Sequence, residues 1–200
     1  MLPARKEAEQ LLIWAHEQNP GPWTDHSRVV ARIAETIAKQ SGLDQERAYL
    51  SGLLHDIGRY EGVRGLHHVY AGYELLNEKG FAEIATICLS HSFPYQYIGA
   101  YSGGDWDCTD GELSVIISFL EKSEYNDYDK LIQLCDAMGM AEGVCLIEKR
   151  LVDATRRYNF NEFTLKKWDS FFELKDYFDR LCNKNIYHLF YDEIRDISFR

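Results

Sequence analysis

Apolar positions recur with helical spacing along nearly the whole chain. We find no alternation typical of strands, no internal repeat and no low-complexity segment. The pattern therefore predicts an all-α fold, with residues 1–200 forming a single domain. Helices are expected at residues 4–18, 24–40, 45–54, 68–79, 81–91, 112–123, 127–140, 143–157, 163–183 and 186–195.

Residues that favour helix ends support several of these boundaries. The segment Asn19-Pro20-Gly21-Pro22 should end the first helix, because proline cannot continue the hydrogen-bond ladder. Thr24 is a suitable N-cap for the second helix, which Gly42 should end. Asp44 should cap the third helix, and Gly80 should separate the fourth from the fifth.

An aromatic stripe marks the helix expected at 163–183. Its members recur at helical spacing, which predicts burial in the core or in a homodimer contact rather than a cofactor site. The stripe consists of Trp168, Phe171, Phe172, Phe178 and Leu181.

The composition is that of a globular protein, with 46% hydrophobic residues and no apolar run near the length of a membrane span. The charged start, "MLPARKEAEQ", is not expected to act as a signal peptide. Five scattered cysteines without a Cys-x-x-Cys pair argue against a disulfide framework. These features predict a protein of the reducing cytoplasm with no membrane partner.

The formal net charge is -10, which opposes a role in coating nucleic acid. A small anionic substrate is still compatible with this charge, because a bound metal ion can reverse the local electrostatics.

Six imidazole and carboxylate groups interrupt the apolar faces of the predicted helices. His26 shares a face with Val30, Ile33 and Ile37, for example, so its ring should point inward. Five successive segments contribute these groups. They are His26, His55, Asp56, His68, His91 and Asp136.

Taken singly, each group is explained by a core histidine or a hydrogen-bonded structural aspartate. Together, four imidazoles and two carboxylates form a ligand set suited to Fe, Mn, Co, Ni or Zn, with Mg as a further candidate. Six ligands exceed the need of one structural zinc, and they match two ions with open positions for water. The set therefore predicts a centre of two divalent metals.

The order of these residues resembles a known signature. His26, the pair His55–Asp56 and Asp136 follow the H…HD…D pattern of HD-domain metal-dependent phosphohydrolases. "LLHDIGR", residues 53–59, is similar to that family's usual LLHDIGK, with Arg59 in place of the lysine. The resemblance is to members of the HDIG type.

Two further features resemble family members that bind two metals. "HVYAGYELL" at 68–76 is similar to their H-x-x-x-G segment, and His91 matches their additional histidine. The resemblance covers about 24–140 and implies a helical HD-domain bundle. It leaves a C-terminal helical extension, about 158–200, without a counterpart.

The expected chemistry is hydrolysis by a metal-bound hydroxide. Asp56 could bridge the two ions, which in such centres lie about 3.5–4 Å apart and lower the pKa of a shared water. His26 and Asp136 would complete one site, and the other would take His68 and His91.

Arg59 is the leading candidate to stabilise the charge that develops on the phosphate, because a guanidinium can bind two phosphate oxygens. Asp56 and Arg59 are thus the expected catalytic residues. Arg64, Lys122 and Lys130 are weaker candidates, better explained as surface charges.

Two assignments have close alternatives in the sequence. We assign His68 rather than its neighbour His67 to the site, because His68 shares a face with Gly72. Asp127 and Asp129 flank a helix start and are better explained as capping residues than as ligands.

An irregular, aromatic-rich segment joins His91 to Glu112, and long segments of this kind often act as lids or recognition loops. With Arg59, the residues Tyr95, Tyr97 and Trp106 are expected to bind substrate, and Tyr101 belongs to the same group. Their rings could stack on a nucleobase. Equally, they could pack over neighbouring helices.

Three functions are compatible with these residues. The favoured one is hydrolysis of a phosphate ester or anhydride in a small phosphorylated substrate. Nucleotides are the favoured class, since the histidine set resembles that of bacterial dinucleoside-tetraphosphate hydrolases. Some HD-fold proteins use the same ligands as a di-iron oxygenase centre. A non-catalytic sensor of metal and nucleotide is the third.

Overall fold

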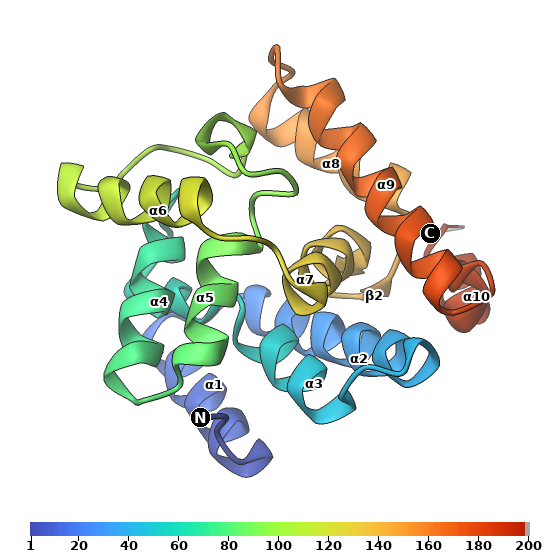
Figure 1. Cartoon of the computed structure of the whole chain (residues 1–200), viewed down its shortest axis with the longest axis horizontal. Helices are drawn as coiled ribbons and strands as arrows, with labels where there is room; N and C mark the ends of the chain where they lie inside the picture. The colour runs from blue at the N-terminus through green and yellow to red at the C-terminus, as the bar shows by residue number, and fades with distance from the viewer. Residues whose placement is uncertain (199–200) are drawn as a thin grey trace.

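The computed structural model describes residues 1–198, which form ten α-helices, three short 3₁₀ helices and a two-stranded hairpin (Figure 1). The expected all-α fold is confirmed. The helices are α1 (Arg5–Gln18), α2 (Trp23–Ser41), α3 (Gln45–Leu54), α4 (His67–Glu78), α5 (Ala82–Ser90), α6 (Asp110–Lys122), α7 (Asp127–Met138), α8 (Ile147–Tyr158), α9 (Thr164–Leu181) and α10 (Tyr191–Ser198). The 3₁₀ helices are η1 (Ile57–Glu61), η2 (Ile98–Ala100) and η3 (Ile186–Phe190), and the strands are β1 (Gly139–Met140) and β2 (Gly143–Val144).

Most of the expected helix ends are confirmed, and one is wrong. Gly42 ends α2 in the left-handed conformation, with φ 79°, and the Asp44 carboxylate accepts a hydrogen bond of 2.8 Å from the Arg47 amide. Thr24 is not an N-cap. Helix α2 begins at Trp23 after Pro22, whose fixed φ suits a helix start, and Thr24 is buried against the ring of His16.

The second half of the chain departs from the expected helices in two places. Residues 139–144 form an antiparallel hairpin, with Gly139 opposite Val144, instead of extending the helices on either side. Gly143 has a φ of 139°, which is incompatible with helix. The helix expected at 186–195 is divided into η3 and α10.

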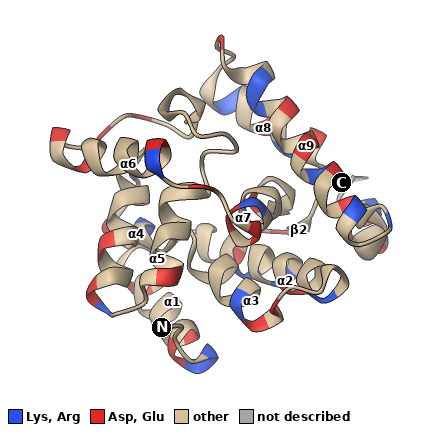
Figure 2. Ribbon diagram, in the orientation of Figure 1, with Lys and Arg blue, Asp and Glu red and all other residues tan. Residues whose placement is uncertain are grey.

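Helix α2 lies near the centre of the fold and packs against α3 and α7 (Figure 1). Helices α4 and α5 pair with each other on one side, and α8, α9 and α10 run along the opposite side. Figure 2 shows acidic and basic positions interspersed along the helices rather than gathered on one of them.

The aromatic stripe of α9 belongs largely to the core, as expected. Phe171 and Phe178 are buried in the cluster formed with α2 and α7, and Trp168 and Phe172 pack against that cluster. Leu181 is the exception, because 41% of its surface is exposed. The homodimer contact stays a prediction.

Two features bear on the environment of the chain. None of the described helices has the length and apolar character needed to cross a membrane. The cysteines at 88, 108, 135, 145 and 182 are all free thiols.

Gly58, in the "HDIG" segment, allows η1 to approach α4. A β-carbon at this position would overlap the carbonyl oxygen of His68 and the amide nitrogen of Gly72. Both of these atoms belong to the backbone of α4, so no side-chain movement could relieve the overlap. The absence of a side chain at Gly58 therefore allows the His55–Asp56 segment to lie close to His68.

We expect Gly58→Ala to lower the free energy of unfolding by at least about 1–3 kcal/mol, because it overfills a packed backbone contact. Denaturant unfolding measures the loss. Gly111→Ala is the matched control: a β-carbon there comes no closer than 4.0 Å to any atom outside the helix. It should leave stability unchanged or raise it by up to about 1 kcal/mol, and an equal loss in both variants would contradict this role for Gly58.

Candidate metal centre

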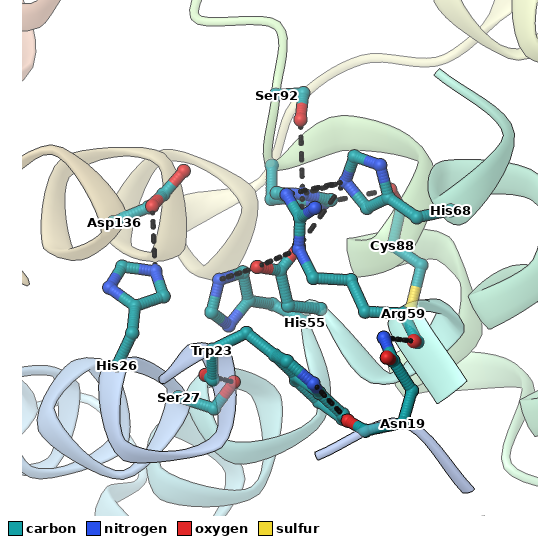
Figure 3. Close-up of polar contacts among 12 residues, drawn as sticks. Asn19, Trp23, His26, Ser27, His55, Arg59, His68, Cys88, Ser92 and Asp136 are labelled. Carbon is teal, nitrogen blue, oxygen red and sulfur yellow. Dashed lines mark hydrogen bonds and ion pairs between the residues drawn. The ribbon is translucent and has the colours of Figure 1, made fainter. Parts of the chain in front are cut away.

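The six imidazole and carboxylate groups singled out in the sequence lie around one site. Figure 3 labels four of them: His26, His55, His68 and Asp136. Five segments deliver them: the first turns of α2, the end of α3, the start of α4, the end of α5 and the last turns of α7. All but Asp136 are buried as whole residues. The members are His26, His55, Asp56, His68, His91 and Asp136.

One half of the site is formed by His26, His55 and Asp56. Each offers a donor atom, and these atoms lie within 4.8 Å of one another. Asp136 joins through His26, whose Nε2 lies 3.0 Å from Oδ1 of Asp136. Side chains 110 positions apart in the sequence thus meet directly.

The other half is formed by Asp56, His68 and His91, whose donor atoms also lie within 4.8 Å of one another. Oδ1 of Asp56 is 3.2 Å from Nε2 of His68 and 3.4 Å from Nε2 of His91. The two Nε2 atoms are 3.4 Å apart. Asp56 is therefore common to both groups, as a bridging ligand would be.

Backbone carbonyls orient three of the imidazoles in the same way. In each, Nδ1 lies within hydrogen-bond distance of the carbonyl three residues earlier in the chain. The pairs are His55 with Gly52 at 2.7 Å, His68 with Gly65 at 2.5 Å, and His91 with Cys88 at 2.8 Å. Because a carbonyl only accepts, Nδ1 carries the proton and the Nε2 lone pair of the neutral ring faces the site.

Two buried atoms of the site have no hydrogen-bond partner within residues 1–198: Nε2 of His55 and Oδ1 of Asp56. An unpaired buried polar atom costs about 1–3 kcal/mol, so such atoms call for an explanation. Both are electron-pair donors, and a cation would satisfy both. The residues present therefore fit divalent metal ions.

The protonation states also suit metal binding. Burial lowers the pKa of His55 to about 4, which keeps the ring neutral at pH 7. Burial by itself would raise the pKa of Asp56, but Arg59 and the neighbouring imidazoles bring it well below its ordinary value. The pKa of Asp136 is likewise lowered, against the effect of burial, by its hydrogen bond with His26.

These shifts predict acid sensitivity of the metal-free protein. Between its ordinary pKa of 6.5 and about 4, His55 binds a proton in the unfolded chain but not in the folded one. The unfolded state thus gains protons as pH falls, and stability declines through this window by up to about 3 kcal/mol. The lowered carboxyl pKa values extend the decline below pH 4. Unfolding measured from pH 7 to 4 tests this, and His55→Gln should flatten the upper part of the curve; a flat wild-type curve would be the contrary result.

Arg59 contacts the centre directly. Its Nε donates to Oδ2 of Asp56 at 2.6 Å, and one terminal nitrogen lies 3.5 Å from Nε2 of His68. Its backbone is held by Asn19, which donates to the Arg59 carbonyl at 2.7 Å and accepts from the Trp23 indole at 2.9 Å (Figure 3). The guanidinium is therefore positioned beside the shared carboxylate.

A cavity of about 600 Å³ opens onto the centre. His26, Asp56, Arg59, His68, His91 and Asp136 all line it. Its remaining wall includes residues of the hairpin, α8 and α9, so the C-terminal extension contributes part of the wall through α9.

Three residues expected to bind substrate do not line this cavity. Tyr95 stacks on Tyr97 and packs against the cluster that contains Phe93. Tyr97 and Trp106 are 48% and 52% exposed and are not part of the cavity wall. Packing over neighbouring helices thus explains Tyr95, and the loop reaches the cavity instead through Tyr101, Ser102 and Gly103.

Several cavity residues were missed by the sequence analysis. Arg150 lies on α8 with a terminal nitrogen 3.8 Å from Oδ1 of Asp136. Lys167 lies on α9, and its ammonium donates to the Ser102 hydroxyl at 3.0 Å. Their helices come after the segment that resembles the family, and no spacing in the sequence links them to the histidines.

The structure also places the residues that were given as alternative ligands and as weaker candidates for phosphate binding. His67 faces Glu61 and Glu112 rather than the centre. Asp127 and Asp129 belong to the first turn of α7, and Asp129 forms a capping box with Asn126. The candidate cations Arg64, Lys122 and Lys130 do not line the cavity.

Comparison with known proteins agrees with this geometry. A family model described as HD domain matches residues 23–141. Over 60 residues the chain is 40% identical to Ribonuclease Y of Mesoplasma florum, an alignment that covers 30% of this chain and 12% of that protein. The chain thus spans only a small part of this relative, and no solved structure gives a match. Since the family model covers more than half of the chain and contains all six clustered residues, the chain belongs to the HD-domain family.

Proposed function

We propose that the protein is a metal-dependent phosphohydrolase that cleaves a phosphate ester or anhydride of a small anionic substrate, with nucleotides the favoured class. One observation carries the proposal. The Asp56 carboxylate is shared by two groups of metal-binding donors at a cavity wall, with the Arg59 guanidinium hydrogen-bonded to it. Family membership supports the reaction class.

The charge of the cavity favours an anionic substrate. Four carboxylates line it, those of Asp56, Asp136, Glu142 and Asp153, and four cationic side chains, those of Arg59, Arg150, Arg157 and Lys167. These charges balance, so two divalent ions would add four positive charges without compensation from the protein. The loaded cavity would attract an anion even though the whole chain is acidic.

The side chains have separate roles in this proposal. Bound divalent ions would supply Lewis acidity and lower the pKa of a water molecule at the centre. His55, His68 and His91 present Nε2 because backbone carbonyls hold Nδ1, and Asp56 joins the two halves. Arg59 is placed to contact oxygens of a transferring phosphoryl group, and it can do so without leaving Asp56 because a guanidinium has five donors.

Aromatic side chains support a nucleotide as the substrate. Trp23 and Trp168, both partly buried, line the cavity in place of the three aromatic residues expected from the sequence. Flat rings of this kind stack on nucleobases whatever the identity of the base. The partial relative is named Ribonuclease Y, and RNA, on which a ribonuclease acts, is a polymer of nucleotides.

The proposal is tested with purified protein loaded separately with Mn, Fe, Co, Ni, Zn and Mg. Nucleoside monophosphates, cyclic nucleotides, dinucleoside polyphosphates and simple phosphomonoesters are incubated with it under argon, and phosphate or nucleotide products are measured. We expect turnover with at least one transition metal and none after chelation.

Other outcomes would favour the competing functions. Iron-dependent oxygen uptake with no anaerobic hydrolysis would support an oxygenase, and metal and nucleotide binding without turnover would support a sensor. Either result would overturn the hydrolase.

A further inference from the structure

Lys167 is a cation of the cavity wall that comes from outside the family match. It lies on α9, beyond residue 141, and its partly buried side chain lines the same cavity as the metal centre. Among the described residues, the ammonium group of Lys167 makes one hydrogen bond, to the neutral Ser102 hydroxyl at 3.0 Å. The ring of Phe171 lies near the limit of a cation–π contact, 6.0 Å from Nζ.

The other cationic side chains of the cavity all have carboxylate partners. Their pairs are Arg59 with Asp56 at 2.6 Å, Arg150 with Asp136 at 3.8 Å, and Arg157 with Asp153 at 2.7 Å. Lys167 has no carboxylate oxygen within 4.0 Å in the part of the chain that the structure describes. A partly buried ammonium without a counterion is costly, and it would be stabilised by an anion in the cavity.

A second cavity residue, next to Ser102 in the sequence, has a side-chain hydroxyl without a hydrogen-bond partner among the described residues. Tyr101 precedes Ser102, lines the cavity and is only 4% exposed. Its hydroxyl has no hydrogen-bond partner within residues 1–198. A buried phenol normally finds a hydrogen-bond partner, so the Tyr101 hydroxyl has an unused donor in the same cavity where the Lys167 ammonium has no carboxylate partner.

We propose that Lys167, Tyr101 and Ser102 form an anion subsite, which binds a second negatively charged oxygen group of the substrate while the metal centre holds the first. This inference rests on the proposed function and narrows its substrate class. The substrate carries two anionic groups, either two phosphoryl groups or a phosphoryl group and a carboxylate. Compounds with one phosphate and an otherwise neutral structure are poorer ligands.

The size of the cavity is compatible with such a substrate. Its volume of about 600 Å³ falls within the range of about 300–1,000 Å³ that small-molecule sites occupy.

Binding of non-hydrolysable phosphonates to the metal-loaded full-length protein, measured by calorimetry under argon, tests the subsite. Methylphosphonate has one anionic group, 3-phosphonopropanoate adds a carboxylate, and propane-1,3-diphosphonate adds a second phosphonate. We expect at least one of the two longer probes to bind about 10-fold or more tightly than methylphosphonate. Which of them gains affinity identifies the second group.

Lys167→Met should abolish this gain and leave methylphosphonate affinity within about 2-fold. Lys167→Arg should retain part of the gain, which a purely structural role would not explain. The matched control is Lys166→Met, since this neighbouring lysine lies over the Tyr95 ring and does not line the cavity. Tyr101→Phe keeps the ring and removes only the unpaired hydroxyl, so it provides a second variant that should reduce the gain.

Two results would overturn the subsite: no gain for either longer probe in the wild type, or a gain that persists in both Lys167→Met and Tyr101→Phe. Neither depends on turnover, because the carbon–phosphorus bond is not hydrolysed. If the protein binds these probes as expected but hydrolyses none of the nucleotides and phosphomonoesters tested for turnover, the proposed hydrolase is contradicted and the subsite remains supported.

Discussion

Asp56→Ala should remove both metal ions and abolish turnover. Among the described residues, its carboxylate is the only group common to the two sets of donors at the centre, so its loss weakens both sets at once. Elemental analysis of purified protein should show metal content falling from up to two ions per chain to nearly none. Removing a single charge-stabilising group commonly costs about 10²–10³-fold in kcat, and losing both ions should cost more.

The matched control is Asp25→Ala. Asp25 precedes His26 on α2, but its carboxylate is exposed and pairs with Arg28 at 3.2 Å. An exposed pair of this kind contributes about 0–1 kcal/mol, so metal content and turnover should be unchanged. Circular dichroism of both variants checks that the helices persist. Full metal content in Asp56→Ala would show that this carboxylate does not bridge the ions.

Single-histidine variants should separate the two halves of the centre. His26→Ala removes a donor from the half that includes Asp136, and His91→Ala removes one from the half that includes His68. Each variant should retain about one ion per chain, because Asp56 and the untouched donors still hold the other. Either loss should lower kcat by about 10²-fold or more, since a two-metal mechanism needs both ions.

Metal content of the double variant His26→Ala/His91→Ala should fall to nearly none. His16→Ala is the control, because this exposed histidine of α1 contacts Thr24 and lies outside the centre. If each single variant lost both ions, the halves would bind cooperatively as one unit. If neither lost an ion, the histidines would not be ligands.

Local patterns in the sequence were sufficient for much of the fold. Helical periodicity located α2 and α3, and Gly42 and Asp44 act at their ends as expected because capping depends on neighbouring backbone atoms. The hairpin at 139–144 was missed. A two-residue strand is too short to produce a detectable alternation, and its pairing depends on the positive φ of Gly143.

The buried metal-binding residues of the candidate site were predicted from the sequence, whereas the residues of the outer cavity wall were not. A polar residue on an apolar helix face must point inward, so His26 and Asp136 could be recognised from spacing. Aromatic residues in an irregular loop have no such periodicity. The sequence therefore could not distinguish Tyr101, which lines the cavity, from Tyr95 and Tyr97, which do not.

The sequence by itself determined where most of the helices lie, which faces those helices bury, and which six side chains carry metal-binding chemistry, because each depends on neighbours a few positions away. Asp56 was expected from the sequence to bridge the two halves, and the structure places it in both groups of donors. Only the tertiary structure decided that α8 and α9 contribute to the wall of the cavity. Lys167 and Ser102 are separated by 65 positions, and their contact follows from how α9 packs across the domain. Such contacts arise from long-range packing, which local periodicity in the sequence does not report.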